Sequence, residues 1–314
     1  MRPAAQIFSK DFPQCGREVK RERAREPLRF FTQCCSNFIG YDFCVFQVGV
    51  GRHGGGMRYI ERLRQRIGVT GSRLCVGLDP RPGEGGAAVA REMLLRVIEQ
   101  TASYAAAFKP NMAYFEAMGL KGIRLLEDLL KGMPSEVPVI LDAKRSDIGE
   151  TQKYYAQGYF DKWNVDAVTL NPFLGYDSIE PFLDWQGKGV YLLAVTSNAG
   201  SADFQRQQLA DGRSVFELVT ALGARSQCEY RATDVGYVVG LTNAADVLAK
   251  FPDAPLLIPG LGAQGGDLAA LAAAGRSAPD VINVSRGILY AGDELDYAAR
   301  AREWAGKIAA AYPA

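Results

Sequence analysis

The chain is organised around residues 141–151, which read LDAKRSDIGET. An apolar run at 137–141 leads into this stretch and predicts a short buried strand of a parallel sheet. Side chains alternate along a strand with period 2, so Asp142 and Lys144 are expected on the same side, with Asp147 following in a loop. Charges at the end of a buried strand are costly unless they pair. The stretch therefore predicts either a structural ion pair or an active site.

The sequence around this stretch alternates short apolar runs with amphipathic stretches of helical length, as βα units do. After a leading helix at 57–67, strands are expected at 73–79, 105–109, 137–144, 167–170, 189–196, 236–240, 256–258 and 281–284, each followed by a helix. Consecutive βα units of this number and size predict an α/β fold, the (β/α)8 TIM barrel. A doubly wound open sheet is the alternative, disfavoured because no G-x-G-x-x-G motif follows the first strand.

The composition is that of an ordinary globular protein of 314 residues, 48% hydrophobic and 23% charged. A formal net charge of +1 gives no indication of a nucleic-acid partner. No apolar run approaches the roughly 20 residues of a membrane helix, and no secretory signal pattern is present. The six cysteines include no C-x-x-C pair, so a reducing, cytoplasmic location is expected.

Residues 1–56 differ from the rest of the chain. They carry nine Lys/Arg against five Asp/Glu, and include the single histidine. A zinc site is one interpretation, although its spacing would be irregular, from Cys15, Cys34, Cys35, Cys44 and His53. A transit peptide is another, and the five acids argue against it. We favour a third, in which Met57 is the true start and 1–56 is an N-terminal extension that is disordered or not made, leaving 57–314 as the barrel domain.

Polar residues gather where the predicted strands end, which in a barrel is the face that carries the active site. They are Asp79, Lys109, Asn111, Asp142, Lys144, Asp147, Asn171, Thr196, Ser197, Asn198, Gln264, Ser285 and Arg286. Any one of them is weakly informative, because strand ends are solvated. Their joint placement at one rim predicts a single functional site.

The last two strands predict an anion site. Residues 259–267, PGLGAQGGD, form a glycine-rich loop that opens a helix, and residues 284–288 read VSRGI. Loops after the seventh and eighth strands commonly bind phosphate in this fold, through backbone N–H groups at a helix N-terminus. Arg286 would add bidentate recognition. Ordinary tight turns are the alternative for either motif alone.

These motifs carry a resemblance. Residues 141–149 closely resemble the D-A-K-x-x-D-I signature of the orotidine 5′-phosphate decarboxylase family. Its other blocks resemble 108–116, 169–172, 259–267 and 285–287, in the family's order. The wording K-P-N, T-S-N-A-G and K-R-S-D-I-G is similar to the longer bacterial branch. The resemblance covers about residues 57–314 and none of 1–56.

The resemblance implies a substrate, orotidine 5′-monophosphate, and a homodimer with shared active sites. Its catalytic array would be Lys109, Asp142, Lys144 and Asp147, with Asp147 reaching into the neighbouring subunit's site. The implied substrate-binding residues are Asp79 and Lys109 at the ribose, Ser197 at the pyrimidine, Thr151 across the dimer, Gln264, Arg286 and the Gly287 backbone at the 5′-phosphate, and Asn111 beside them.

The implied reaction is the last step of de novo pyrimidine (UMP) biosynthesis. Loss of CO₂ from C6 of the pyrimidine leaves a carbanion, which the Lys144 ammonium would stabilise and then protonate. Asp142 beside the substrate carboxylate would be a like-charge contact, relieved as CO₂ leaves. Residues 201–208 are the expected closing loop. No metal or organic cofactor is expected.

Three rivals remain. A phosphosugar enzyme of the same superfamily, such as a keto-gulonate-phosphate decarboxylase or a hexulose-phosphate synthase, would use Mg²⁺, and the decarboxylase a histidine that the chain lacks after Met57. A non-catalytic phosphate-binding dimer has no reason to keep so costly a charge array. A fusion to a phosphoribosyltransferase would need a longer chain.

Overall fold

The structure is a computed structural model, and it describes residues 56–312 apart from 82, 84, 231, 242–243, 261–267 and 293–295. The side chains of residues 244 and 245 are also outside the description. The predictions made for residues 1–55, including the zinc site and the N-terminal extension, lie outside the described residues. The same holds for Gln264 and for most of the glycine-rich loop.

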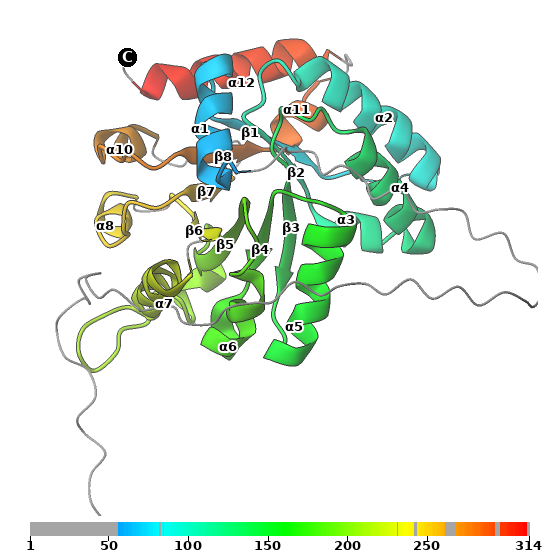
Figure 1. The fold of residues 1–314 in the computed structure, drawn as a ribbon. Coiled ribbons are helices and arrows are strands. Elements are labelled where there is room, and N and C mark those ends of the chain that lie inside the picture. The colour runs from blue at the N-terminus through cyan, green and yellow to red at the C-terminus, as the bar shows by residue number, and fades with distance from the viewer. Residues whose placement is uncertain are drawn as a thin grey trace, which may run out of the picture. The chain divides into compact units, whose positions relative to one another are not determined.

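Eight parallel strands form the centre of the fold, ringed by helices (Figure 1). Hydrogen-bonded neighbours run in the order β2-β1-β8-β7-β6-β5-β4-β3, and isolated bridges Phe108–Val139 and Asn111–Asp142 join β2 to β3. The predicted (β/α)8 barrel is therefore confirmed. The strands are β1 Leu74–Leu78, β2 Ala107–Pro110, β3 Ile140–Arg145, β4 Ala167–Leu170, β5 Lys188–Val195, β6 Thr233–Val239, β7 Leu256–Pro259 and β8 Asp280–Val284.

The helices follow the strands as the pattern predicts. Helices α2 and α12 pack against each other on the outside of the ring (Figure 1). The helices are α1 Tyr59–Thr70, α2 Gly86–Thr101, α3 Met112–Glu116, α4 Gly119–Gly132, α5 Gly149–Ala156, α6 Tyr176–Ile179, α7 Val215–Glu229, α8 Ala244–Leu248, α10 Leu268–Ala273, α11 Arg286–Leu289 and α12 Tyr297–Ala311. A π-helical turn, Gln157–Lys162, continues α5, and 3₁₀ turns lie at Pro172–Leu174, Glu180–Phe182 and Ala199–Ala202.

Two sequence predictions need correction. The single helix expected after the fourth strand, at 178–185, is instead the short helix α6 followed by a 3₁₀ turn, because Pro181 lacks the N–H that a continuous helix requires. The short helices α3 and α11, which directly follow β2 and β8, were not predicted. Both begin beside predicted site residues, so they shape the rim of the barrel.

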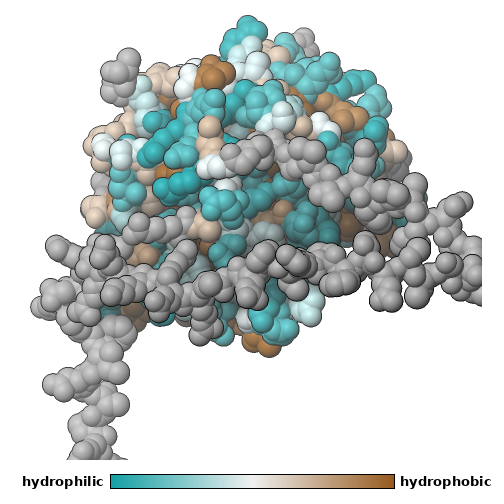
Figure 2. Space-filling view, viewed as in Figure 1, coloured by the Kyte–Doolittle hydropathy of each residue, from teal (hydrophilic) through white to brown (hydrophobic). Residues whose placement is uncertain are grey.

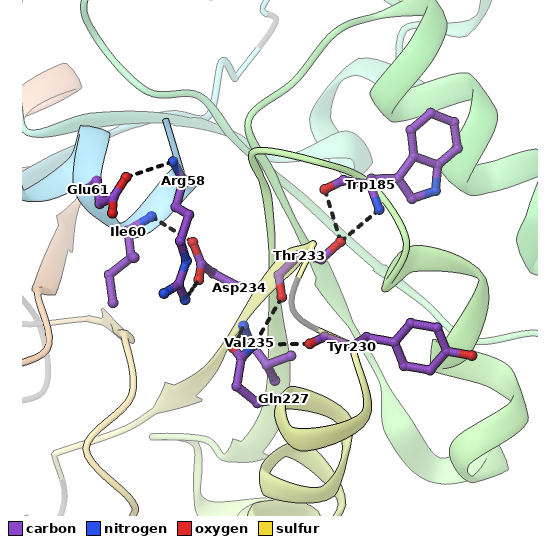
Figure 3. Close-up of polar contacts among 9 residues, drawn as sticks. All are labelled: Arg58, Ile60, Glu61, Trp185, Gln227, Tyr230, Thr233, Asp234 and Val235. Carbon is purple, nitrogen blue, oxygen red and sulfur yellow. Dashed lines mark hydrogen bonds and ion pairs between the residues drawn. The ribbon is translucent and has the colours of Figure 1, made fainter. Parts of the chain in front are cut away.

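Helix α1 closes the amino end of the barrel. Arg62 Nη1 lies 2.7 Å from Asp166 Oδ1, immediately before β4, and Arg66 Nε donates to the carbonyl of Ala105, before β2. Arg58 and the N–H of Ile60 both bind the carboxylate of Asp234 in β6 (Figure 3). With one end sealed by ion pairs, the carboxyl ends of the strands are left as the open end.

The core has two parts. The larger apolar cluster lies between the strands and the surrounding helices, and a smaller cluster joins Tyr59 and Leu63 of α1 to strand residues such as Cys75, Ile140 and Tyr191. On the face shown in Figure 2, hydrophilic residues predominate among those described, with hydrophobic ones in small separate groups. Within the described residues, no helix is long and apolar enough to span a membrane.

Candidate active site

Three charged side chains meet at the carboxyl end of the barrel. Asp142 of β3 accepts from the ammonium groups of two lysines: Lys109 Nζ of β2 lies 2.8 Å from Oδ2, and Lys144 Nζ lies 2.5 Å from Oδ1. Lys109 is 4% exposed and Asp142 8%, whereas the Lys144 side chain is 48% exposed. Lys109 and Asp142 are therefore the buried part of the cluster, and the cation of Lys144 projects from them toward the open end of the barrel.

The path of the chain places these groups. β3 pairs with β4 at Leu141–Val168 and again at Arg145–Leu170, so the register shifts between them. Lys144 lies within this bulge with φ of +48°, a backbone conformation uncommon for a residue with a side chain. Asp142 and Lys144 do meet, as strand alternation predicted, but across an irregular strand that the period-2 pattern does not describe.

Neighbouring charges reverse the effect of burial at this site. Burial acts to lower the pKa of Lys109, but the carboxylates of Asp142 and Asp79 outweigh it and raise that pKa above its ordinary value. Burial likewise acts to raise the pKa of Asp142, and the ammonium groups of Lys109 and Lys144 hold it well below its usual range. Both residues are therefore charged at neutral pH. Burial raises the pKa of the nearby Cys75 thiol to about 12, which keeps it neutral.

A pocket of about 400 Å³ opens beside this cluster. Its size is within the range of small-ligand sites, and it is lined by Asp79, Tyr114, Gly260, Asn283, Val284, Ser285, Arg286, Gly287 and Trp304. Three buried polar atoms of these residues have no hydrogen-bond partner among the described residues: Asp79 Oδ1, Asn283 Oδ1 and Ser285 Oγ. Because an unpaired buried polar group is costly, this arrangement is typical of a site completed by a ligand.

The structure brings most of the predicted phosphate residues to this pocket. Arg286 begins α11 and is exposed at the pocket's edge. The carbonyl of Gly287 accepts from Trp304 Nε1 at 3.3 Å, and a Cβ built on Gly287 would lie 2.8 Å from that nitrogen. Glycine at 287 therefore allows α12 to pack closely behind the loop. Gln264 lies outside the described residues.

Other predicted site residues lie around the rim. Asn111 Oδ1 caps α3 by accepting from the N–H of Ala113, which engages this oxygen in holding the chain. Ser197 is partly buried, and its backbone packs on Gly240. A Cβ built on Gly240 would lie 2.5 Å from the Ser197 nitrogen. Thr151 is partly buried on α5.

Asp147 does not join the cluster within one chain. Its Oδ1 accepts from the N–H of Ile148 at 2.8 Å, and among the described residues it forms no ion pair with a lysine. The predicted four-residue array is thus a three-residue cluster within the described part of a single chain, and the predicted role of Asp147 across a dimer stays a prediction.

Sequence reasoning gave no role to two residues that the structure places at the site. Thr169 of β4 is fully buried and its hydroxyl bonds both Asp142 and the backbone of Lys144. Asn283 of β8 is 8% exposed and lines the pocket. A threonine in a strand reads as an ordinary β-branched residue, so the only signal at Thr169 was its place in the block 169–172 that resembles the family. A single asparagine in the apolar run 281–284 was a signal that could have been used.

A second cavity, of about 570 Å³, lies between α8 and α10 and is lined in part by Leu248, Phe251 and Arg276. None of the predicted site residues, including the three of the charged cluster, lines this cavity, so it is not a candidate for the active site. Among the residues that the structure describes, no three His, Cys, Asp or Glu side chains are grouped to hold a metal ion.

A (β/α)8 barrel with a lysine–aspartate–lysine cluster at the carboxyl ends of its strands, beside a pocket, defines a class of barrel proteins whose functional site lies at that end. A family model described as "Orotidine 5′-phosphate decarboxylase / HUMPS family" matches residues 72–301, and the chain belongs to this family.

Individual relatives agree. The curated orotidine 5′-phosphate decarboxylase of Verminephrobacter eiseniae is 44% identical over 260 residues, 78% of this chain and 94% of the relative. That of Methylibium petroleiphilum is 42% identical over 265 residues, 79% and 95% of the two chains. The solved structure of Leishmania donovani OMP decarboxylase superposes with a TM-score of 0.71 at 39% identity, covering 81% of this chain and 98% of that one.

Proposed function

We propose that this protein decarboxylates orotidine 5′-monophosphate to uridine 5′-monophosphate, the last step of pyrimidine nucleotide biosynthesis. The observation that carries the proposal is the cluster of Lys109, Asp142 and Lys144 at the open end of the barrel. The family match and the names of the curated relatives support the same reaction. The family description also names the HUMPS proteins, but the curated relatives given above are orotidine 5′-phosphate decarboxylases, and the chain has no histidine after Met57 for a phosphosugar reaction that needs one.

The proposed chemistry assigns a separate task to each charge. The C6–carboxylate bond breaks, its electron pair stays on C6, and CO₂ departs. The ammonium of Lys144 stabilises that charge and then transfers a proton to C6, leaving a neutral amine that is reprotonated from solvent. Asp142 holds Lys144 in place from 2.5 Å, and Lys109 keeps Asp142 ionised despite its burial. Asp142 also repels the substrate carboxylate, an effect lost as neutral CO₂ forms.

The pocket beside the cluster accounts for the rest of the substrate. Its unpaired Asp79 carboxylate oxygen is suited to accept from ribose hydroxyls, with Lys109 donating nearby. The guanidinium of Arg286 and the backbone at the start of α11 are suited to a phosphate. Because the phosphate would lie away from the reacting carbon, its binding energy can serve to close the loop of residues 201–208, which follows β5, over the site.

A homodimer with shared active sites is part of the proposal. Within the part of the chain that the structure describes, Asp147 pairs with no lysine, and the segments that follow β3 and β4 expose large apolar side chains: Ile148 at 60%, Tyr154 at 68% and Phe173 at 69%. Exposed apolar groups of this size are typical of an interface. The location in the cytoplasm, and the assignment of residues 57–314 as the decarboxylase domain, remain predictions.

The loss of orotidine 5′-monophosphate absorbance tests the reaction. Purified protein is assayed in excess EDTA beside Lys144→Ala and beside Lys131→Ala, which replaces an exposed lysine on α4 that pairs with Glu127. We expect conversion that persists in EDTA, is retained by Lys131→Ala and is abolished by Lys144→Ala. A folded protein without turnover would refute the proposal and lead to assays of Mg²⁺ with phosphosugar substrates.

Mixing two inactive chains tests the shared sites. If Asp147 acts across a dimer, Lys144→Ala and Asp147→Asn each inactivate the homodimer, but a mixed dimer contains one site with both residues intact. Coexpression in equal amounts should restore about a quarter of the wild-type activity, since half the dimers are mixed and half their sites complete. No recovery, from chains shown to form mixed dimers, would place Asp147 and Lys144 in separate roles within one chain.

A further inference from the structure

Thr169 lies directly beneath the catalytic cluster. It is fully buried in β4, and its Oγ1 donates to Asp142 Oδ1 at 2.9 Å. The same oxygen accepts from the backbone N–H of Lys144, also at 2.9 Å. A hydroxyl has one proton to donate, so here its donor is committed to the carboxylate and a lone pair to the lysine backbone.

The position of this hydroxyl matters because the strand pairing fails there. Between the pairs Leu141–Val168 and Arg145–Leu170, β3 has three residues and β4 has only Thr169. The N–H of Lys144 is therefore bonded by a side chain where a regular ladder would offer a carbonyl. Lys144 has φ of +48° at this point, a conformation that persists only where surrounding contacts hold it.

Asp142 depends on the same residue. Its Oδ1 is shared between Lys144 Nζ and the Thr169 hydroxyl, and its Oδ2 takes Lys109. Of these three donors, Thr169 and Lys109 are buried, whereas Lys144 is the group that must change protonation state. While Lys144 gives up its proton, the hydroxyl of Thr169 is a donor to Oδ1 that does not change.

We infer that Thr169 is a positioning residue for the proton donor, fixing with one hydroxyl both the carboxylate of Asp142 and the backbone from which Lys144 extends. The inference rests on the proposed decarboxylation. The β-branched side chain suits this role, because its χ1 is restricted and its hydroxyl is set in direction before substrate binds. Serine keeps the hydroxyl with more rotational freedom, whereas valine keeps the shape and removes both bonds.

The test compares Thr169→Val with Thr169→Ser and with a matched control. Thr233 of β6 is buried and uses its hydroxyl in a comparable way at the amino end of the barrel: it accepts from the N–H of Trp185 at 3.0 Å, and its single proton is shared between the carbonyls of Phe182 at 3.0 Å and Trp185 at 3.1 Å. The contacts with Trp185 are drawn in Figure 3. Thr233→Val therefore removes an equivalent buried hydroxyl far from the cluster. If Thr169→Val does not fold, Thr169→Cys takes its place, because a thiol is a poor donor and acceptor.

The readouts are kcat and KM for orotidine 5′-monophosphate, and exchange of the C6 hydrogen of uridine 5′-monophosphate with D₂O, which reports proton transfer without decarboxylation. We expect Thr169→Val to lower kcat and the exchange rate by about 10- to 100-fold with KM changed by less than about 3-fold, since misplacing a reacting group acts on the rate. Thr169→Ser should recover most of both rates, and Thr233→Val should keep wild-type kcat.

Two results would overturn the inference: a kcat of Thr169→Val equal to that of Thr233→Val, or a Thr169→Ser variant as slow as Thr169→Val. The wild-type protein and Lys144→Ala are assayed in the same series. If the wild type does not convert the substrate, the proposed function fails. If it converts the substrate and Thr169→Val does so equally well, only the role of Thr169 fails.

Discussion

Replacing Lys109 by methionine should destabilise the protein in a way that depends on pH. Methionine keeps most of the volume of the side chain and removes its charge. Asp142, 8% exposed, then loses the ammonium at 2.8 Å but keeps Lys144 and the Thr169 hydroxyl. Removing one partner of a buried ion pair costs about 3–5 kcal/mol, and because two donors remain we expect about 3 kcal/mol at pH 7.

The sign of the pH effect follows from the direction of the pKa of Asp142. That pKa is held low in the folded wild type, so Asp142 contributes stability above its ordinary pKa, near 4, which is lost as pH falls below that value. In Lys109→Met, the carboxylate keeps one ammonium against the same burial, so its folded pKa rises. The stability difference between wild type and variant should therefore be largest at neutral pH and shrink toward pH 3.

Urea unfolding followed by tryptophan fluorescence at pH 7 and at pH 3 measures this difference. Lys131→Met is the control. The ammonium of Lys131 also lies 2.8 Å from a carboxylate, but the Lys131 side chain is 69% exposed, so its replacement should not move the unfolding midpoint. A difference below about 1 kcal/mol at pH 7, or one of equal size at both pH values, would show that the Lys109–Asp142 pair does not hold the cluster together as argued.

Three further outcomes are expected. Arg286→Ala should raise KM for orotidine 5′-monophosphate by about 10- to 100-fold, as loss of a charged hydrogen bond does. The variant should turn over orotidine, which lacks the phosphate, at the wild-type rate. An equal loss of activity with both substrates would contradict a role of Arg286 at the phosphate. Gly77→Ala would bring a Cβ to 2.6 Å from Ser285 Cβ, so KM should rise by about 10-fold, whereas Gly68→Ala, with nothing within 4 Å of its Cβ, should keep wild-type kinetics. Arg62→Met leaves Asp166 buried beside α1 and should lower the free energy of unfolding by about 3–5 kcal/mol in urea titrations, with KM unaffected. A rise in KM would show that the packing of α1 at the amino end of the barrel is coupled to the site.

The sequence predicted the barrel because the hydrophobic pattern has few ways to be satisfied. Apolar runs such as 137–141 and 167–170 can be buried on both faces only in a parallel sheet covered by helices. The pairing of Asp142 with Lys144 was also predictable, since charges at the end of a buried strand must find partners, whereas Lys109 entered the predicted array only through the family resemblance. Both inferences use rules that act locally or on every barrel.

What could not be predicted depends on contacts between segments. The positive φ of Lys144 and the bulge in β3 arise from pairing with β4, which strand periodicity does not contain. The hydroxyl of Thr169 has a role only once β3 and β4 are aligned in that register. The break at Pro181 of the helix expected at 178–185 was readable from the sequence and was missed. A position for Asp147 across a dimer needs a second chain.

The two ends of the barrel handle polar groups differently, and this contrast indicates which end is functional. At the amino end, the buried Asp166 and Asp234 are bound by Arg62 and Arg58 of the same chain. Although Asp280 Oδ1 and Arg62 Nε lack a hydrogen bond within the described part of the chain, Asp280 lies 3.5 Å from the guanidinium of Arg276 and Arg62 binds through its other nitrogens. At the carboxyl end, Asp79, Asn283 and Ser285 keep buried atoms without a partner among the described residues, and all three line one pocket. A fold selected for stability alone would pair or replace such atoms, because each desolvated polar group left unpaired costs roughly 1–3 kcal/mol. These unpaired atoms lie together, next to an ammonium supported by a buried carboxylate. That arrangement is favourable only if a ligand completes their hydrogen bonds. The binding energy of the ligand then also offsets the backbone strain at Lys144.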